Sequence, residues 1–441
     1  MTHLSNNIQL TDLPLEILIN ISEFLSTEDI LNLSLCSKCF HDLLSFIKFN
    51  ENVNFKDINK LPYFDSFTNV VYHASSKSFP RSLRFLSWYC NDYLLSQLPD
   101  SLKSLNLGGR YNQPMPQLPD SLKSLHLGND YNHPLPQLPV SLISLNLGHC
   151  YNHSLPQLPD SLKSLHLGND YNQPLSQLPD SLKRLDLGYD YNQPLPQLPV
   201  SLISLNLGWY YNRPLSQLPN SLKNLHLGFY YNQPLPQLPN SLKCLNLGYC
   251  YNRPMSQLPD SLKSLHLSHC YNQSLSQLPN SLKSLHLGNN YNQPLLQLPD
   301  SLKSLDLGCC YDQPLPQLPD SLESLHLGWF YNQPLSQLPD SLLSLYLGWN
   351  YNQPFPERTS NEVANATLRE SQLPGSLKIL NLGHCYNQPL PQLPISLISL
   401  HLSSNYNQPL PQLPDSLRFL KVLRMFQLPT LSSNITIDFF D

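Results

Sequence analysis

The chain has 441 residues, of which 41% are hydrophobic and only 13% are charged, and its formal net charge at pH 7 is −5. Such a composition excludes a charge-rich disordered chain, and the lack of a basic run or stripe argues against nucleic acid as a partner. The 42 prolines interrupt the chain so often that no stretch reaches the ~18 consecutive apolar residues of a membrane helix. We therefore expect a folded protein that does not span a membrane.

The beginning of the chain has no basic side chain and leads into no apolar segment. A secretory signal needs both features, so we expect an intracellular protein, in the cytoplasm or the nucleus. In such a reducing compartment its ten cysteines are expected to remain thiols.

Residues 8–50 predict a small domain of three short helices. Pro14 suits the first turn of a helix, and the apolar residues from Ile17 to Leu25 then follow helical spacing. Ser26 begins a pattern similar to a capping box, which favours the start of a second helix, and a third helix is expected over residues 40–46. So small a domain has a marginal core, and an exposed apolar face that receives a partner is physically reasonable.

This segment resembles an F-box. Leu13-Pro14-Leu15-Glu16-Ile17 matches the start of the F-box pattern, and Ser37-Lys38 matches a later part of it, although Phe40 stands where Trp is common. The resemblance implies binding to a Skp1-like adaptor and, through it, to a cullin-RING complex. The residues that it implies at the Skp1 interface are Leu13, Pro14, Ile17, Ile21 and Leu25. The alternative interpretation is a small helical cap on the rest of the chain.

Residues 51–81 connect this domain to the rest of the chain. Their composition is mixed, and Val70-Val71-Tyr72 indicates a strand. We expect a short ordered connector that also caps the repeat array that follows.

From residue 82 to residue 431 the chain repeats itself every twenty residues. Thirteen units in strict register open at Ser101, at Ser121 and so on to Ser341. Degenerate units at the ends of the array and the units after an insertion raise the total to about seventeen. An insertion over residues 357–371 interrupts the array, after which the frame resumes, so we interpret the insertion as a loop. Residues 432–441 form the expected C-terminal tail.

Each unit carries leucines in the order L-x-x-L-x-L, as at Leu102, Leu105 and Leu107. The last two lie on the same side of a short strand, and stacked units bury their leucines in one core, each strand pairing in parallel with the next. Residues 114–119 have prolines at alternating positions and therefore predict an extended outer wall instead of a helix. The expected fold class is α+β, with a three-helix domain followed by a parallel-β solenoid.

The units resemble leucine-rich repeats and, more specifically, FNIP repeats. Tyr131-Asn132-His133-Pro134-Leu135 matches the aromatic-Asn-x-Pro-Leu core of an FNIP repeat, and Leu178-Pro179-Asp180-Ser181-Leu182 matches its Leu-Pro-x-Ser-Leu segment. The chain departs from the family in having Tyr where the family name has Phe, and in its shorter period. The resemblance suggests an amoebal cell, or a large DNA virus of amoebae, in which case the location is the host cell.

Two repeated positions, counted from the serine that opens each unit, carry residues able to bind metals. Position six is often histidine, and we expect these side chains to form an exposed polar ladder on the concave face. Position ten is cysteine directly after histidine in His149-Cys150, His269-Cys270 and His384-Cys385. Sequence neighbours rarely face each other along an extended segment, and no third orienting group recurs with these pairs, so we expect a structural role without catalysis. No metal and no cofactor is predicted.

Positions nine and ten vary most between units, and recognition is expected where a regular scaffold varies. Large aromatic residues gather there, and such residues often anchor protein interfaces. The predicted target-binding residues are Trp209, Phe229, Tyr249, Trp329 and Trp349. At position ten, Tyr210, Tyr230 and Phe330 are expected to face inward and fill the turn. The uniform Tyr-Asn pair of positions eleven and twelve predicts a repeated stacking and hydrogen-bonding role.

Together the resemblances imply the substrate-recognition adaptor of a Skp1-cullin-F-box type ubiquitin ligase. Its F-box would bind Skp1, and its solenoid would hold a target protein, of unknown identity, for ubiquitination. The chain itself is not expected to be an enzyme, because ubiquitin is transferred by the conjugating enzyme of the ligase. The alternative is a non-degradative protein-binding scaffold, or a decoy that occupies Skp1.

Overall fold

The computed structural model divides the chain into two compact units, Met1–Ser201 and Leu202–Asp441. Each unit consists of short parallel strands, with almost no helix among the described residues. The structure describes residues 49–61, 64–72, 79–89, 94–95, 97–255, 257–275, 277–356, 373–424, 426 and 435–440, together with residues 25, 26, 29, 30 and 44.

In the described part of the first unit, parallel strands pair in chain order from β1 to β8. They are β1 (Phe49–Asn54), β2 (Phe67–Tyr72), β3 (Phe85–Trp88), β4 (Ser104–Leu107), β5 (Ser124–His126), β6 (Ser144–Asn146), β7 (Ser164–His166) and β8 (Arg184–Asp186). Between β1 and β2 lie the short helix α4 (Phe55–Ile58) and the 3-10 turn η2 (Phe64–Ser66). From β4 onward each strand residue pairs with the residue twenty positions later, as Leu125 does with Leu145.

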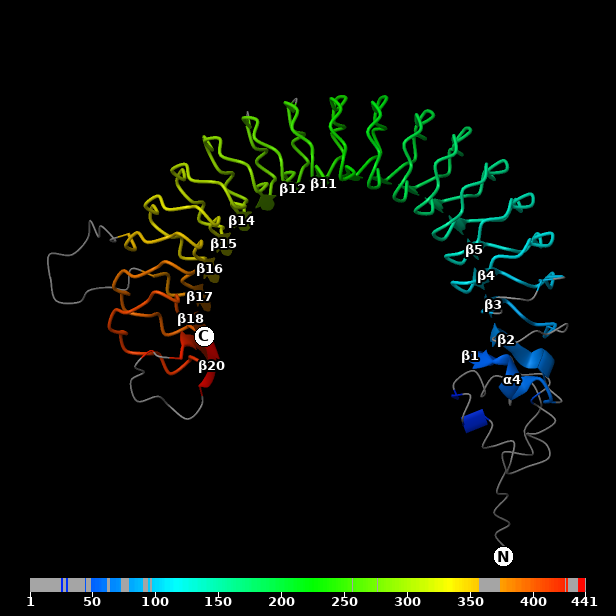
Figure 1. Cartoon of the computed structure of the whole chain (residues 1–441), viewed down its shortest axis with the longest axis horizontal. Coiled ribbons are helices and arrows are strands. Elements are labelled where there is room, and N and C mark those ends of the chain that lie inside the picture. Colours follow the sequence, from blue (N-terminus) through cyan, green and yellow to red (C-terminus); the bar gives the residue numbers. More distant parts are fainter. Residues whose placement is uncertain are drawn as a thin grey trace, which may run out of the picture. The chain divides into compact units, whose positions relative to one another are not determined.

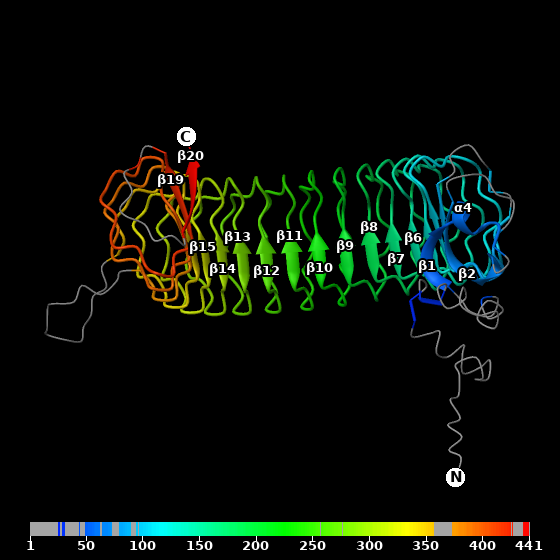
Figure 2. The same cartoon turned by 90° about the horizontal axis from the view of Figure 1, so that it is seen from below.

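The second unit has the same arrangement, and its described strands pair in parallel from β9 to β20. They are β9 (Ser204–Asn206), β10 (Asn224–His226), β11 (Cys244–Asn246), β12 (Ser264–His266), β13 (Ser284–His286), β14 (Ser304–Asp306), β15 (Ser324–His326), β16 (Ser344–Tyr346), β17 (Ile379–Asn381), β18 (Ser399–His401), β19 (Phe419–Leu423) and β20 (Thr436–Phe440). Within this unit the strands line the inner side of the curve (Figure 1) and neighbouring strands point the same way (Figure 2). The turns that follow the strands therefore gather along one edge of the sheet.

The repeated leucines form the core, as predicted. In the repeat that opens at Ser121, the side chains of Leu122, Leu125 and Leu127 are at most 1% exposed, whereas His126 between the last two is exposed. Burial of one leucine side chain contributes ~1.5–3 kcal/mol. Because every turn adds three such residues, the stacked leucines are the main source of stability.

The outer wall is extended, as the prolines predict. Residues 114–118 contain neither helix nor strand. The wall returns to the sheet through a turn in which the Leu122 amide donates to the Pro119 carbonyl at 3.0 Å. The serine that opens the unit joins this turn to the preceding one, because the Ser121 hydroxyl donates to the Leu102 carbonyl at 2.6 Å.

The Tyr-Asn pair stacks and forms hydrogen bonds, which confirms its predicted role. The rings of Tyr131 and Tyr151 are fully buried and stack with their centroids 6.3 Å apart, and burial raises the pKa of Tyr151 to about 12. Beside them, the Asn132 side chain accepts a hydrogen bond from the Asn152 amide at 3.1 Å, and the Asn152 side chain accepts one from the Asn172 amide at 3.0 Å. Within each compact unit, this asparagine ladder joins successive turns.

An aromatic cluster lies at the first strands. Phe49 of β1 stacks on Phe67 of β2 with ring centroids 4.9 Å apart, and Tyr72 of β2 stacks on Trp88 of β3 at 5.4 Å. Strand β2 confirms the strand predicted from Val70-Val71-Tyr72. Trp88 lies opposite Leu107 of β4, and Tyr72 lies opposite Trp88, so large buried rings replace one of the repeat leucines here. Val70 and Leu86 keep an aliphatic residue at the other position. The connector thus adds its own strands to the parallel sheet.

Most of the predicted three-helix domain lies outside the described residues. The hydrogen bonds expected of the capping pattern at Ser26 are present, because the Asp29 amide donates to the Ser26 hydroxyl at 3.1 Å and the Ile30 amide donates to the Ser26 carbonyl at 3.0 Å, but the three-helix domain itself is not confirmed. Further along, Leu44 is buried, and its carbonyl accepts a hydrogen bond from the Ser66 hydroxyl at 2.7 Å. This contact attaches the segment to the start of β2.

The repeat frame resumes after the insertion, as predicted. Strand β16 pairs with β17, and Leu345 lies opposite Leu380, while residues 357–371 themselves lie outside the described residues. Near the C-terminus, β20 lies within the expected tail and pairs with β19, with Leu420 opposite Ile437. The sequence did not indicate this last strand, because it lacks the leucines of the repeat.

Candidate functional site

Aromatic rings follow one another in the turns after strands β9 to β12. At position nine, Trp209 stacks on Phe229 with ring centroids 4.3 Å apart, and Phe229 stacks on Tyr249 at 4.2 Å. His269 extends the series, 4.3 Å from Tyr249. We call these four residues the first aromatic stack.

A second aromatic stack, formed by Trp329, Trp349 and His384, lies further along the same unit. The two indole rings are 4.4 Å apart and only 3° from parallel, and His384 lies 3.9 Å from Trp349. His384 is also in contact with the next turn, where its Nδ1 lies 2.8 Å from the Ser404 hydroxyl. The insertion at residues 357–371 falls between the turns of Trp349 and His384.

The backbone sets the ring spacing in both stacks. The amide at position ten donates to the carbonyl at position nine of the preceding turn, as Tyr230 does to Trp209 at 3.0 Å and Cys250 does to Phe229 at 2.8 Å. Successive turns are therefore held about 4.8 Å apart, the spacing of neighbouring strands. Aromatic rings at position nine then meet at a favourable stacking distance.

The five predicted target-binding residues all belong to these two stacks. Trp329 is 47% exposed, Trp349 40%, Tyr249 37% and Trp209 36%, whereas Phe229 is half-buried between its neighbours. These rings lie in the turns at the edge of the sheet and not on the strands themselves. Target binding stays a prediction for all of them.

The inward orientation predicted for position ten is wrong. Tyr210, Tyr230 and Phe330 are 44%, 43% and 50% exposed, and the rings of Tyr210 and Tyr230 stack side by side at 5.1 Å. At Tyr230 and Phe330 the main-chain amide donates to the carbonyl at position nine of the preceding turn. The exposed side chains of Tyr210 and Tyr230 enlarge the aromatic surface beside the first stack.

Histidines at position six lie on the exposed side of the strands, as predicted. Some of them pair with a carboxylate on the next strand: His166 Nδ1 lies 3.0 Å from Asp186, and His286 Nδ1 lies 3.1 Å from Asp306. The hydrogen bond to the carboxylate raises the pKa of both histidines. Where no such partner follows, as at His266, burial lowers the pKa.

One His-Cys pair departs from the prediction. Cys150 Sγ lies 3.8 Å from His149 Nδ1, so these sequence neighbours do face each other, and a third group, Asp170 of the next turn, lies 3.4 Å from the same nitrogen. Burial, followed by the negative charge of Asp170, raises the pKa of the Cys150 thiol. The sequence missed this cluster because Asp170 lies twenty residues away from Cys150.

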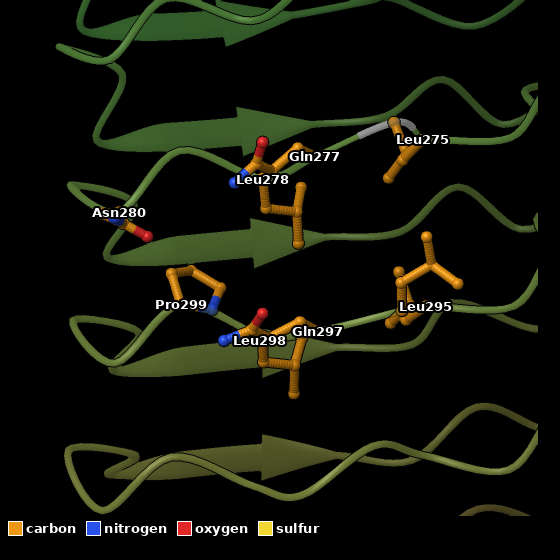
Figure 3. A pocket seen from close by; sticks show the side chains of 9 residues that line it. Leu275, Gln277, Leu278, Asn280, Leu295, Gln297, Leu298 and Pro299 are labelled. Carbon is orange, nitrogen blue, oxygen red and sulfur yellow. The ribbon is translucent and has the colours of Figure 1, made fainter.

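Shallow grooves lie on the outer wall between successive turns. The groove in Figure 3 has a volume of about 250 Å³ and is lined by Leu275 and Leu278 of one turn and by the equivalent Leu295 and Leu298 of the next. Similar grooves recur at other turns, including one lined by Leu215. The grooves follow from the repeat and mark no unique site.

The predicted Skp1-binding residues precede the aromatic stacks by more than 180 residues, since the last of them is Leu25 and the first stacked ring is Trp209. Leu25 is described and half-buried. Leu13, Pro14, Ile17 and Ile21 lie outside the described residues, so their part in an interface stays a prediction. In the described ranges, no helix has the length and apolar character needed to cross a membrane.

The fold and the exposed edge define a repeat solenoid of the leucine-rich-repeat class. Among solved structures, the chain is similar to CroV588, described as a novel circular leucine-rich-repeat protein, with 28% identity and a TM-score of 0.65 over 89% of this chain and 71% of that chain. It is also similar to YopM from Yersinia enterocolitica WA-314, with 26% identity and a TM-score of 0.51 over 78% of this chain and 88% of that chain. A comparison with curated proteins found no match.

The chain belongs to the FNIP repeat family, and it carries an F-box domain that matches residues 10–52. An F-box combined with a leucine-rich-repeat-like solenoid indicates a role in protein interactions, and both families are typically non-enzymatic interaction modules. The FNIP Repeat family matches residues 91–130, 111–150, 151–190, 191–230, 231–270, 271–310, 311–348, 331–357 and 386–422.

Proposed function

We propose that the chain is the substrate-recognition adaptor of a Skp1-cullin-F-box type ubiquitin ligase. The observation that carries this proposal is the presence, in one chain, of an F-box at residues 10–52 and a repeat solenoid with exposed aromatic stacks. The F-box binds a Skp1-like adaptor, and the solenoid binds the target protein. Ubiquitin is transferred by the conjugating enzyme of the ligase, so the chain itself performs no chemistry and acts inside the cell.

The aromatic stacks are the part of the solenoid best suited to bind a target. Exposed Trp and Tyr residues contribute much of the binding energy at protein interfaces. Here each ring is already held by its neighbours, as Trp329 is by Trp349 at 4.4 Å. Binding therefore costs little side-chain entropy, which favours affinity.

The Skp1 contact is tested by direct binding of the purified full chain to a Skp1-type adaptor. The double variant Leu13→Ala, Pro14→Ala should bind at least about tenfold more weakly, because hot-spot residues of an interface each contribute ~2 kcal/mol or more. Leu296→Ala is the matched control, since Leu296 is 79% exposed on the outer wall. Circular dichroism verifies that each variant is folded. If the intact, folded chain does not bind Skp1, the proposal fails.

The adaptor role is tested by ubiquitin transfer in a reconstituted ligase. Proteins captured by the intact chain, but not by the double variant Trp329→Ala, Trp349→Ala, are candidate targets. Their ubiquitination should require both the intact aromatic stack and intact Leu13 and Pro14. Targets that bind but are not ubiquitinated would favour the alternative, a non-degradative scaffold or a decoy that occupies Skp1.

A further inference from the structure

Three side chains of different chemistry converge in the first unit. His149 and Cys150 lie in the turn after β6, and Asp170 lies in the turn after β7. His149 Nδ1 is 3.8 Å from Cys150 Sγ and 3.4 Å from Asp170 Oδ1, and the three atoms all lie within 4.8 Å of one another. In the part of the chain that the structure describes, no other three such atoms lie so close together.

The backbone holds the three residues in place. The Asp170 amide donates to the His149 carbonyl at 2.9 Å, and the Cys150 amide donates to the Asn129 carbonyl at 2.7 Å. Because the main chain at each position is bonded to a neighbouring turn, only side-chain rotations separate these residues from a common centre. Such preorganisation lowers the entropy cost of binding a ligand there.

The geometry excludes a catalytic triad. In a triad, one ring nitrogen of histidine faces the nucleophile while the other bonds to the carboxylate. Here both Cys150 and Asp170 face the same nitrogen, Nδ1 of His149. The arrangement is instead that of three possible metal ligands whose donor atoms lie within 4.8 Å of one another.

Two of the three distances between the donor atoms match those of a tetrahedral metal centre. With zinc bonds of about 2.3 Å to sulfur and about 2.0–2.1 Å to nitrogen and oxygen, tetrahedral angles place sulfur and nitrogen roughly 3.6 Å apart, and nitrogen and oxygen roughly 3.4 Å apart. The corresponding distances here are 3.8 Å and 3.4 Å. Small side-chain rotations are enough to complete the coordination of an ion.

We propose that His149, Cys150 and Asp170 form a zinc site that joins two successive turns of the solenoid. His149 Nδ1, Cys150 Sγ and a carboxylate oxygen of Asp170 each provide one bond, and water occupies the fourth position. The Cys150 thiol gives up its proton to solvent as the zinc–sulfur bond forms, so each bound ion releases one proton. About half of the His149 and Asp170 side chains is exposed, which leaves the ion a path from solvent.

The two other His-Cys pairs provide an internal comparison. The residue that corresponds to Asp170 is Asn290 after Cys270 and Asn405 after Cys385, and a neutral amide is a poorer zinc ligand than a carboxylate. In addition, His269 and His384 belong to the aromatic stacks. The carboxylate therefore sets the pair at His149 apart.

Zinc titration of the full chain tests the site. The metal-free, reduced protein is titrated with zinc against a chromophoric indicator, and with Co²⁺ as a spectroscopic substitute. We expect Cys150→Ser and Asp170→Asn each to weaken this site about tenfold or more, with loss of one zinc equivalent. Cys150→Ser should also remove the thiolate-to-cobalt absorption of this site and the release of one proton. Cys385→Ser, at the same position of another unit, should leave all three readouts unchanged.

The variants are expected to fold, because asparagine already occupies position ten at Asn290 and small side chains are tolerated there. Circular dichroism provides the check. Unchanged zinc binding in Cys150→Ser would overturn the proposal. Loss in Cys150→Ser with full binding in Asp170→Asn would also overturn it, because the site would then not depend on the carboxylate.

Discussion

At the scale of the residue, the pKa of a histidine on a strand depends on the residue twenty positions later, which lies beside it on the next strand. His266 and His286 occupy the same strand position, and their rings are 5.5 Å apart. Yet the hydrogen bond to Asp306 raises the pKa of His286, whereas burial lowers the pKa of His266. A regular repeat therefore places identical residues in different electrostatic surroundings.

The ion pair of His286 and Asp306 predicts a pH-dependent stability. A raised histidine pKa means that the pair contributes fully below the ordinary value of ~6.5 and that this contribution is lost as the pH rises through the folded-state value. Burial acts to raise the pKa of Asp306, but hydrogen bonds from His286 and Gly308 lower it, so the carboxylate stays charged. His286→Gln should therefore be more destabilising at about pH 6 than at pH 8.5, by ~0.5 kcal/mol or less, because solvent screens the half-exposed pair.

Thermal unfolding of both proteins at the two pH values measures this difference. His266 and His326 also face the pair from neighbouring strands, but burial lowers their pKa values, so they carry less charge than His286. Asp306→Asn is the matched control, and the double variant should lose no more pH-dependent stability than either single variant. An equal loss at both pH values would contradict the prediction.

The asparagine ladder predicts a second residue-scale effect. Asn332 Oδ1 accepts a hydrogen bond from the Asn352 amide at 2.9 Å, so Asn332→Ala leaves a part-buried donor unpaired and should cost ~1–3 kcal/mol. Asn332→Asp keeps the acceptor, as Asp312 already does for the Asn332 amide, and should cost less. Denaturant unfolding compares the two variants, and equal midpoints would refute a role for the acceptor.

At the scale of the element, position six also influences the turn that follows the strand. At Asn246 the side chain accepts a hydrogen bond from the Gly248 amide at 2.9 Å, and Gly248 adopts a φ of +69°. After His226 the turn differs, and the Gly228 carbonyl accepts a hydrogen bond from the Tyr231 amide at 3.3 Å. Local hydrogen bonding thus decides the form of a turn within a constant repeat length.

Gly248→Ala should destabilise the second unit strongly. Its positive φ costs a side chain ~1–2 kcal/mol, and a Cβ atom there would lie only 2.2 Å from the Gly228 carbonyl oxygen. Gly375→Ala is the control, because a Cβ at that position meets nothing within 4 Å. Denaturant unfolding should show a loss of at least ~2 kcal/mol for the first variant and little change for the second. Similar free energies of unfolding for the two variants would show that the turn accommodates a side chain at position 248.

At the scale of the whole molecule, every turn depends on its sequence neighbours. Strand β12 pairs with β11 and β13, with leucine opposite leucine in both cases. In such proteins stability is roughly the sum of each repeat and its nearest interfaces. Turns are therefore interchangeable as long as the twenty-residue frame is kept.

Deletion of residues 261–280 should leave the second unit folded. The deletion removes one full period, so the turn of β11 meets that of β13 with the leucine, tyrosine and asparagine columns still aligned. Deletion of residues 261–270 removes half a period and should break these columns. Circular dichroism and thermal unfolding distinguish the two deletion variants. An equal loss of structure in both would show that folding does not depend on the twenty-residue frame.

The sequence by itself determined the features that recur with the period. The burial of Leu122, Leu125 and Leu127, the stacking of the tyrosines and the extended proline wall were all predictable, because each depends on residue type at a constant spacing. The period also implied the parallel register, since identical residues twenty positions apart pair most favourably. The F-box resemblance came from the same kind of local pattern, now matched at residues 10–52.

Only the tertiary structure decided which irregular residues meet and where they point. Tyr230 is exposed and its ring stacks on Tyr210, while its amide donates to the Trp209 carbonyl of the preceding turn. Asp170 reaches His149 because stacking brings residues of successive turns to one strand spacing, and β20 pairs with β19 without the leucines of the repeat. These contacts depend on side-chain directions and on neighbours that are remote in the chain, and a local sequence pattern specifies neither.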